Sequence, residues 1–352
     1  MKTLKNKVFT LLAGLLVVLA LGAGGAYWRY QTALSQPLNL AAERLLEVPA
    51  GASPNGMFNA LEAEGTLKGA FWLRVHWRLN FANQGLKAGD YRLQPGYTAS
   101  DLMNLWLRGE VIQYRITLVE GWNFRQVRAA LASAPRLEQT LTNVDDETLM
   151  RSLGLEGRPE GQFFPDTYQY VRGMRDVDLL RQANERLERI LSELWAKRAE
   201  GLPYGTPYQA LVMASLVEKE TGLARERPEI AGVFVRRLQK NMLLQTDPAV
   251  IYGLGERYTG NLTREHLRTP TPYNTYTQAG LPPTPIALVG REAIYAALHP
   301  EPGDSLYFVA RGDGSHVFSR TLEEHNRAVR EYQLKRREGY RSSPSPADET
   351  RP

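Results

Sequence analysis

Two glutamates close an apolar segment of the chain, and residues of this type at such a position can support proton transfer. The segment from Ala210 to Val217 is apolar on every face and leads into Glu218-Lys219-Glu220. Thr206 and Pro207 before it suit the N-cap and first position of a helix, so we expect a buried helix. A buried carboxylate costs free energy unless it is paired or stays protonated, and a protonated carboxyl group can act as a general acid.

Position in the helix favours Glu220 as the acid, with Glu218 as the second choice. Gly222 is a typical residue just past a helix end, which places Glu220 in the last turn. There the unpaired carbonyls and the negative end of the helix dipole disfavour a carboxylate charge and raise its pKa, as suits a general acid. A structural interpretation stays open, in which one glutamate faces solvent and the other pairs with Arg225 or Arg227.

Helices dominate the sequence around these glutamates. Apolar residues recur at helical spacing from Asp176 to about Glu200, and a Gly/Pro-rich turn at 201–205 follows. The apolar stretches 305–310 and 316–319 flank a short glycine-containing loop and predict a β-hairpin. We expect a mainly helical catalytic domain over residues 151–333 and a disordered tail, rich in Arg, Ser and Pro, over residues 334–352.

A weak internal repeat precedes this domain, and it predicts an α+β fold. Gly51, Gly96 and Gly121 each end a strand-like stretch, and a helix-capping residue stands two positions later: Ser53, Thr98 and Asn123. Apolar pairs at i and i+4 follow each cap. The stretch 44–95 reads as strand, helix, helix and strand, and resembles a lysin-motif (LysM) unit, a module associated with N-acetylglucosamine polymers. We expect LysM-like α+β modules over residues 29–150, with a simple spacer as the alternative.

The N-terminus carries an uncharged apolar run. Residues 8–28 would form a transmembrane helix roughly 30 Å long, which matches the hydrocarbon core of a bilayer. Lys2, Lys5 and Lys7 precede the run, so the positive-inside rule makes residues 1–7 a cytoplasmic tail and places the rest outside. The alternative is a cleaved signal peptide, because the small residues around 21–26 could hold a cleavage site. Both interpretations export the protein.

The composition limits the available chemistry. None of the 352 residues is cysteine, which excludes disulfides, thiolate nucleophiles and zinc–cysteine sites. The five histidines show no metal-ligand spacing, so we expect neither a metal nor a cofactor. The formal net charge of +5 suits a protein that works beside anionic lipids or acidic wall polymers, and export argues against a nucleic-acid partner.

Five segments together point to a family. They are Glu160-Gly-Gln-Phe-Phe-Pro-Asp-Thr-Tyr168, Ala214-Ser-Leu-Val-Glu-Lys-Glu-Thr-Gly222, Gln245-Thr-Asp-Pro-Ala-Val-Ile-Tyr-Gly253, Thr271-Pro-Tyr-Asn-Thr-Tyr276 and Gly280-Leu-Pro-Pro283. In this order they closely resemble the YceG-like endolytic murein transglycosylases, the MltG family, and the resemblance runs over nearly the whole chain. One departure is Thr284, where the family pattern has glycine, and it affects the expected shape of that loop.

The resemblance implies lytic cleavage of the β-1,4 bond between N-acetylmuramic acid and N-acetylglucosamine in nascent strands, which leaves a 1,6-anhydro-muramoyl end. Glu220 would protonate the departing glycosidic oxygen and then take a proton from the C6 hydroxyl. The residues that the match places along the sugar groove carry amide, carboxylate, hydroxyl or aromatic groups: Gln245, Asp247, Tyr252, Tyr273, Asn274, Thr275 and Tyr276. Asp247, which precedes Pro248, could instead cap a helix.

Two other functions stay open at this point. A muramidase-type hydrolase needs a second carboxylate, which Glu218, Glu226 or Asp247 could supply. A non-catalytic wall-binding scaffold would use only the LysM-like region. The expected location is the cytoplasmic (inner) membrane, as a single-pass protein with its catalytic domain outside. The expected partners are peptidoglycan glycan strands and that membrane, with peptidoglycan synthases as candidates.

Overall fold

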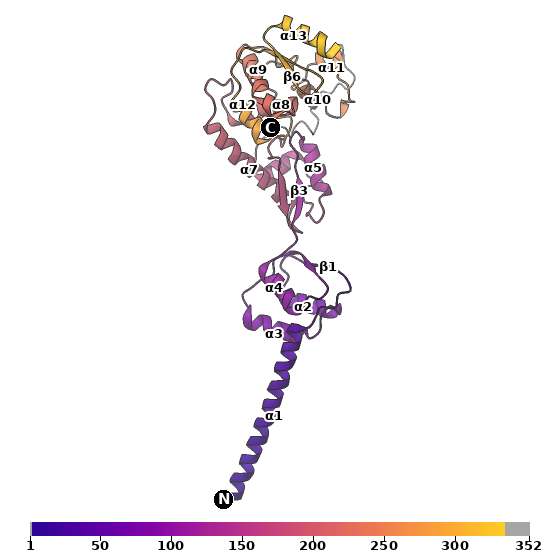
Figure 1. Cartoon of the computed structure of the whole chain (residues 1–352), viewed down its shortest axis with the longest axis vertical. Coiled ribbons are helices and arrows are strands. Elements are labelled where there is room, and N and C mark those ends of the chain that lie inside the picture. The colour runs from indigo at the N-terminus through magenta and orange to yellow at the C-terminus, as the bar shows by residue number, and fades with distance from the viewer. Residues whose placement is uncertain (1, 335–352) are drawn as a thin grey trace. The chain divides into compact units, whose positions relative to one another are not determined.

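The chain combines helices with small two-stranded sheets (Figure 1). The computed structural model describes residues 2–334, so the predicted tail lies outside the described residues except for its first position. Contacts divide the described residues into two compact units: one holds residues 2–114, 135–138 and 169–174, and the other holds the remaining residues up to 334. The predicted combination of helices and sheets is confirmed, whereas the expected functional boundaries at residues 29, 151 and 334 stay predictions.

The first unit pairs two strands beside three short helices. Its elements are α1 (Lys2–Ser35), β1 (Arg44–Val48), α2 (Pro54–Ala63), α3 (Ala70–Asn80), β2 (Gly89–Leu93) and α4 (Ala99–Arg108). Strands β1 and β2 are antiparallel, with Arg44 opposite Leu93 and Val48 opposite Gly89. The predicted order of strand, helix, helix and strand is therefore confirmed, while the LysM-like assignment stays a prediction.

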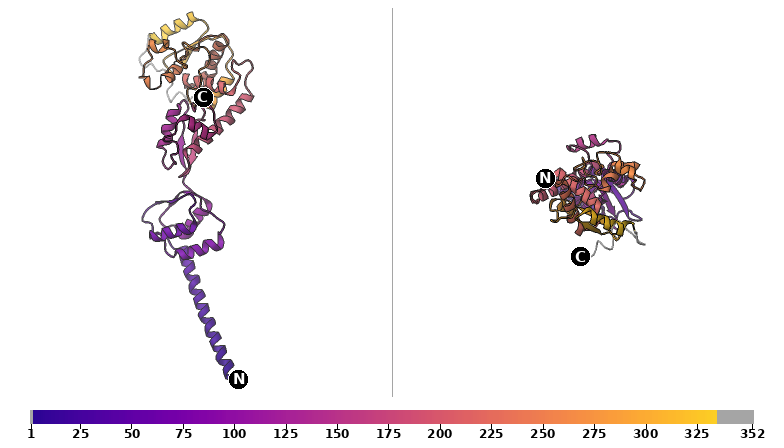
Figure 2. Two further views of the ribbon diagram at one scale, coloured as in Figure 1. Left: turned by 180° about the vertical axis from the view of Figure 1, so that it is seen from behind. Right: turned by 90° about the horizontal axis from the view of Figure 1, so that it is seen from above.

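Helix α1 extends away from the other helices of the first unit as one continuous rod (Figures 1 and 2). Within residues 2–334, its stretch Phe9–Ser35 alone is long and apolar enough to cross a membrane, with a mean hydropathy of 2.2. The predicted transmembrane segment ends at Trp28, but the helix continues to Ser35. No proline interrupts it, because the first proline of the chain is Pro37. Its last turns join the unit, because Ala33 is buried in the core.

The repeat of tight turn and capped helix is confirmed in detail. Gly51, Gly96 and Gly121 all adopt positive φ angles of 75°, 91° and 76°. Helices α2, α4 and α5 (Phe124–Ser133) each begin three residues later. The predicted N-caps accept the expected main-chain hydrogen bonds, and they are Ser53, Thr98 and Asn123. The predicted apolar pairs are all buried: Met57, Leu61, Leu102, Trp106, Val127 and Leu131.

The second unit is mainly helical and carries a hairpin near its end. Besides α5, its elements are α6 (Asp146–Leu153), α7 (Asp176–Ala196), α8 (Pro207–Glu220), η1 (Ala224–Glu226), α9 (Arg227–Gln239), α10 (Asp247–Leu254), η2 (Gly255–Arg257), α11 (Arg264–Arg268), α12 (Arg291–Leu298), β5 (Tyr307–Ala310), β6 (His316–Ser319), α13 (Leu322–Val329) and η3 (Arg330–Leu334). Strands β5 and β6 pair antiparallel, as predicted. Strands β3 (Tyr114–Thr117) and β4 (Thr167–Tyr170) form a further two-stranded sheet.

Helix α8 is the central helix of the second unit. Every residue from Ala210 to Val217 is at most 2% exposed, and α7, α9, α10 and α12 pack around the helix. Thr206 caps its start and Pro207 follows, as predicted. The helix ends at Glu220 because Thr221 turns to an extended conformation. Gly222 does not adopt a positive φ, so the predicted end is confirmed without the expected left-handed glycine.

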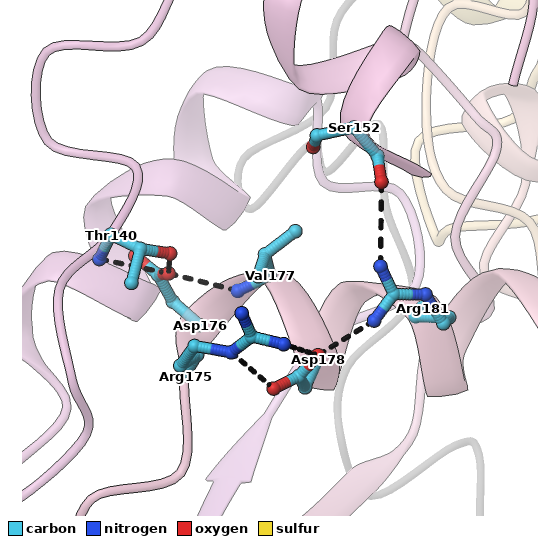
Figure 3. A network of polar contacts seen from close by, with 7 residues as sticks. All are labelled: Thr140, Ser152, Arg175, Asp176, Val177, Asp178 and Arg181. Atoms are coloured by element: carbon cyan, nitrogen blue, oxygen red, sulfur yellow. Dashed lines mark hydrogen bonds and ion pairs between the residues drawn. The ribbon is translucent and has the colours of Figure 1, made fainter. Parts of the chain in front are cut away.

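Asp176 ties the start of α7 to the preceding loop (Figure 3). Its carboxylate is 1% exposed and accepts the main-chain N–H groups of Thr140 and Leu141, each at 3.0 Å. The N–H of Val177 donates to it at 2.8 Å, and the Thr140 hydroxyl donates as well. One buried carboxylate thus satisfies three main-chain donors at the entry to the long helix.

Asp178 lies in the same turn of α7 as Asp176, but it forms exposed ion pairs instead of buried hydrogen bonds (Figure 3). Its carboxylate pairs with Arg175 at 2.7 Å and with Arg181 at 2.6 Å, and its side chain is 30% exposed. Arg181 also donates to the main-chain oxygen of Ser152, at the end of α6. Because water can replace these exposed partners, we expect the ion pairs to contribute less to stability than the buried bonds of Asp176.

The Asp176→Ala variant should be strongly destabilised, because three buried N–H groups lose their acceptor, at a cost of about 3 kcal/mol or more. The matched variant Asp178→Ala should lose less than about 1 kcal/mol. Thermal unfolding of the full chain in detergent, followed by circular dichroism, measures both. Equal shifts of the thermal midpoint in the two variants would show that the Asp176 contacts do not hold this helix start.

Candidate active site

Glu220 lies partly buried at the last position of α8. The hydroxyl of Thr246 donates a hydrogen bond to its carboxylate. Thr246 is 1% exposed and is fixed by Thr275, whose hydroxyl accepts the Thr246 N–H at 2.9 Å and donates to its carbonyl at 3.1 Å. Thr246 lies in the quoted segment from Gln245 to Gly253, but its contact with Glu220 could not be predicted, because 26 residues separate the two and only the folding of the chain brings them together.

Burial raises the pKa of Glu220 to about 7. The hydrogen bond from Thr246 lowers this pKa, whereas the negative charge of Asp247 raises it. The positive charge of Arg237 has a smaller, lowering effect. The position at the C-terminal end of α8 acts in the same direction as burial, because that end of the helix dipole is negative. Near neutral pH this carboxyl group can therefore both give and take a proton.

Glu218 has a different environment, although only Lys219 separates it from Glu220 in α8. Its side chain is 5% exposed, and one oxygen lies 3.4 Å from the guanidinium group of Arg227. The other oxygen accepts the N–H of Gly290 at 3.0 Å. Burial raises the pKa of Glu218 and the charge of Arg227 lowers it. Both oxygens thus have a partner, so the pairing with Arg227 that the sequence left open applies to Glu218.

Asp247 and Tyr276 form a pair beside the donor of Glu220. The Tyr276 hydroxyl donates to the Asp247 carboxylate at 2.6 Å, and burial raises the pKa of Tyr276. Asp247 is the first residue of α10 and Thr246 is the N-cap, so Asp247 is not the helix cap. A carboxylate and a hydroxyl are therefore available next to Glu220.

Gln245 stands before these residues in a strained backbone conformation. Its φ of 53° lies in the left-handed region, which residues other than glycine rarely adopt. Its N–H donates to the Thr275 carbonyl at 3.1 Å, and its side-chain oxygen lies 3.5 Å from the guanidinium group of Arg237. These contacts impose a conformation that the residue does not favour, as is common in segments that serve a site.

Asn274 holds the neighbouring loop from inside. It is 0% exposed, and its amide nitrogen donates to the main-chain oxygens of His266, Leu267 and Thr269. Its amide oxygen accepts the N–H of Tyr276 at 3.0 Å. With Thr275 also buried, at 2%, these two predicted site residues position the segment instead of presenting free groups.

Tyr273 and Tyr252 meet edge to face, with ring centroids 4.9 Å apart. Tyr273 is 8% exposed, and its hydroxyl shares a hydrogen bond of 2.9 Å with Thr284. Thr284 also donates to the carbonyl of Pro285 at 2.7 Å. Thr284, at the position where we expected a glycine, is thus built into the loop, where its hydroxyl connects the tyrosine to the proline-rich segment.

A cleft of about 1010 Å³ lies beside Glu220, not around it. Lys219 and Pro248 line it, while their neighbours Glu220 and Asp247 do not. Tyr252 is the one predicted site residue in its wall. The residue next to the candidate acid therefore lines the cleft, together with residues of α5, α10 and the segment 158–160.

Glu160 is a second unusual carboxyl group, and it lines this cleft. It is 5% exposed, and its oxygens accept the N–H of Phe124 at 3.0 and 3.2 Å. Burial raises its pKa to about 7, although the bonds from Phe124 and from the Tyr252 hydroxyl lower it. Glu160 begins one of the quoted segments, but we predicted no role for it. The available signal in the sequence was a charged residue close to the apolar pair Phe163-Phe164.

Glu226 and His316 form a buried pair, with a carboxylate oxygen 2.8 Å from Nδ1. The N–H of His316 also donates to this carboxylate at 3.1 Å. Glu226, one of the residues considered as a second carboxylate, is therefore engaged with a partner. Across residues 2–334 no cluster of three or more His, Asp or Glu side chains has the spacing to hold a metal ion.

Comparison with known proteins gives a consistent result. The family model of the YceG-like family matches residues 46–331. An endolytic murein transglycosylase of Bacillus subtilis (strain 168) is 31% identical over 334 residues, which cover 88% of this chain and 90% of that protein. A protein of the same name from Streptococcus pneumoniae serotype 2 is 29% identical, over 90% of this chain and 64% of its own length. A crystal structure of a yceG-like protein from Listeria monocytogenes is 28% identical, with a TM-score of 0.51, covering 82% of this chain and 99% of that one.

The Glu220→Gln variant should be more stable than the unmodified chain at neutral pH but not in acid. The pKa of Glu220 is about 7 in the fold against an ordinary 4.5, so ionisation opposes folding increasingly between these pH values. This difference corresponds to about 3 kcal/mol above pH 7, and it is absent below the unfolded-state pKa. The thermal midpoint at pH 4 to 8 measures it. A gain that is equal across this range would contradict a buried, neutral Glu220.

Proposed function

The chain belongs to the YceG-like family, and from this premise we propose that it is a membrane-anchored lytic transglycosylase that cuts peptidoglycan glycan strands internally. Its relatives in Bacillus subtilis and Streptococcus pneumoniae carry the name endolytic murein transglycosylase. The observation that supports the mechanism is the environment of Glu220, a partly buried carboxyl group with a pKa near 7 at the end of a buried helix.

In the proposed reaction Glu220 is first an acid and then a base. The protonated carboxyl group gives its proton to the glycosidic oxygen, and the bond from that oxygen to C1 of the muramoyl sugar breaks. The resulting carboxylate takes the proton of the C6 hydroxyl, whose oxygen bonds to C1. The products are a free hydroxyl on one strand and a 1,6-anhydro end on the other, and Glu220 is again protonated. The hydrogen bond from Thr246 would hold the carboxyl group in place through both steps.

The substrate groove in this proposal uses the predicted site residues in two ways. Gln245, Asp247, Tyr252 and Tyr276 would contact the sugars, through hydrogen bonds and an aromatic face. The buried residues Tyr273, Asn274 and Thr275 would keep the loop of Tyr276 in position, as their internal hydrogen bonds support.

A muramidase-type hydrolase is the second candidate, and the charge of Asp247 near Glu220 favours it. Asp247 lies close enough to raise the pKa of Glu220, so a second carboxylate is present that could position a water molecule. The two reactions differ in their products, because the hydrolase leaves a reducing end that is heavier by one water than the anhydro end.

The test is mass spectrometry of the fragments that the full chain, in detergent, releases from purified sacculi. Anhydro ends are expected. Glu220→Gln should lower the rate by about 10²–10⁴-fold or more, because the amide cannot transfer the proton. Glu218→Gln is the matched control and should lose less, since its carboxylate pairs with Arg227. Reducing ends would favour the hydrolase, and full activity of folded Glu220→Gln would exclude Glu220 as the acid.

The membrane part of the proposal rests on α1. Its residues 9–29 are exposed, and three lysines precede them, so we propose an uncleaved anchor with the N-terminus in the cytoplasm and the second unit outside. The unit formed by β1, α2, α3 and β2 would act as a LysM-like, glycan-binding spacer within residues 29–150, before a catalytic part over residues 151–333. Peptidoglycan synthases are candidate partners at this location.

An uncleaved anchor predicts that the protein extracted from membranes keeps its original N-terminus. The length of the apolar stretch supports this expectation, because the 27 residues of Phe9–Ser35 exceed the about 7–15 apolar residues of a signal peptide. N-terminal sequencing of the extracted protein measures the start. A mature chain that begins near Gly25 or Ala26 would show a cleaved signal peptide and a soluble exported enzyme.

A further inference from the structure

The cleft beside Glu220 is lined by charged and apolar side chains. Its cationic residues are Arg125, Arg128, Arg158 and Lys219, and its acidic residues are Asp146, Glu160 and Glu256. Pro248, Ile251, Tyr252 and Tyr258 add apolar and aromatic surface. A neutral sugar chain needs no cation without an acidic partner, so such a cation in the lining indicates a ligand with negative charge.

Two of the four cations already have acidic partners and two do not. Arg125 lies 2.8 Å from Glu256, and Arg128 lies 3.9 Å from Asp146. Within the described part of the chain, no carboxylate lies within 4.0 Å of the charged groups of Arg158 or Lys219. Lys219 donates to the main-chain oxygen of Gly121 at 3.2 Å, which leaves its charge unbalanced.

The position of these cations relates them to the reacting bond. Lys219 directly precedes Glu220 on the last turn of α8, and Pro248 directly follows Asp247. The volume of about 1010 Å³ is at the upper end of that of small-molecule sites and can hold several residues of a polymer. The muramoyl sugar, whose C1 bond breaks in the proposed reaction, is also the sugar that carries a peptide with free carboxylates.

We propose that this cleft binds the carboxylate-bearing peptide of the muramoyl sugar, with Arg158 and Lys219 as the main cationic contacts. The proposal rests on the proposed function, and it names the part of the substrate that the cleft distinguishes. Glu160, which also lines the cleft, opposes an anionic ligand only weakly. Because burial keeps the pKa of Glu160 at about 7, this carboxyl group is partly neutral near pH 7 and repels an anionic ligand less than an ordinary glutamate would.

The test compares two substrates for the full chain in detergent: glycan strands that carry their peptides, and the same strands after an amidase has removed the peptides. The unmodified chain should have a lower KM for the peptide-bearing strands, and added salt should reduce this preference. Arg158→Gln should reduce the ratio of kcat/KM between the two substrates by about 3–10-fold, as one exposed charge contact allows. Lys219→Gln should act in the same direction.

Arg189→Gln is the matched control, because Arg189 is exposed on α7 and does not line the cleft. It should leave the ratio unchanged. Equal loss on both substrates in Arg158→Gln, or no change in the ratio, would overturn the proposal. Titration of the unmodified chain with a muramoyl peptide, followed by fluorescence of the protein, tests binding without cleavage. If the chain cuts neither substrate, the proposed function fails, and this titration still decides whether the cleft takes the peptide.

Discussion

The burial of α8 is the constraint on which the rest of the site depends. The middle residues of α8 are apolar on every side. Their side chains are removed from water only when four other helices surround α8. The helix therefore carries its last residue, Glu220, out of bulk solvent. An amphipathic helix with the same ending would leave this glutamate on the surface with an ordinary pKa. Hydrophobic packing, and not a special local motif, sets the protonation state of the candidate acid.

The carboxylates of the second unit differ in the partners that the fold provides. Glu218 has a guanidinium group and an N–H, Glu226 has a histidine, and Asp176 has three main-chain donors. Glu220 has one hydroxyl, from Thr246. A single neutral donor stabilises a carboxylate less than a cation or several N–H groups do. Among these four groups, Glu220 is therefore the one whose charge can change during a reaction without breaking an ion pair or a set of main-chain bonds.

The features that could be predicted from the sequence are those that neighbouring residues determine. Thr206 and Pro207 fix the start of α8, Asn123 caps α5, and the apolar stretches near the end form the hairpin. The sequence did not show which glutamate pairs with Arg227, because Gly290, 72 residues away, completes that pairing. The cleft could not be predicted from the sequence either, because its cations come from separate segments that only the fold brings together.

The cleft and the acid share two structural elements, and this links ligand binding to protonation. Helix α8 contributes both Lys219 and Glu220, and the start of α10 contributes both Pro248 and the Thr246 that bonds to Glu220. The Thr246 bond lowers the pKa of Glu220, so any ligand that shifts α10 and lengthens this bond would raise that pKa. Substrate contacts with Pro248 would therefore lie two residues from the hydroxyl that helps to set the protonation state of Glu220.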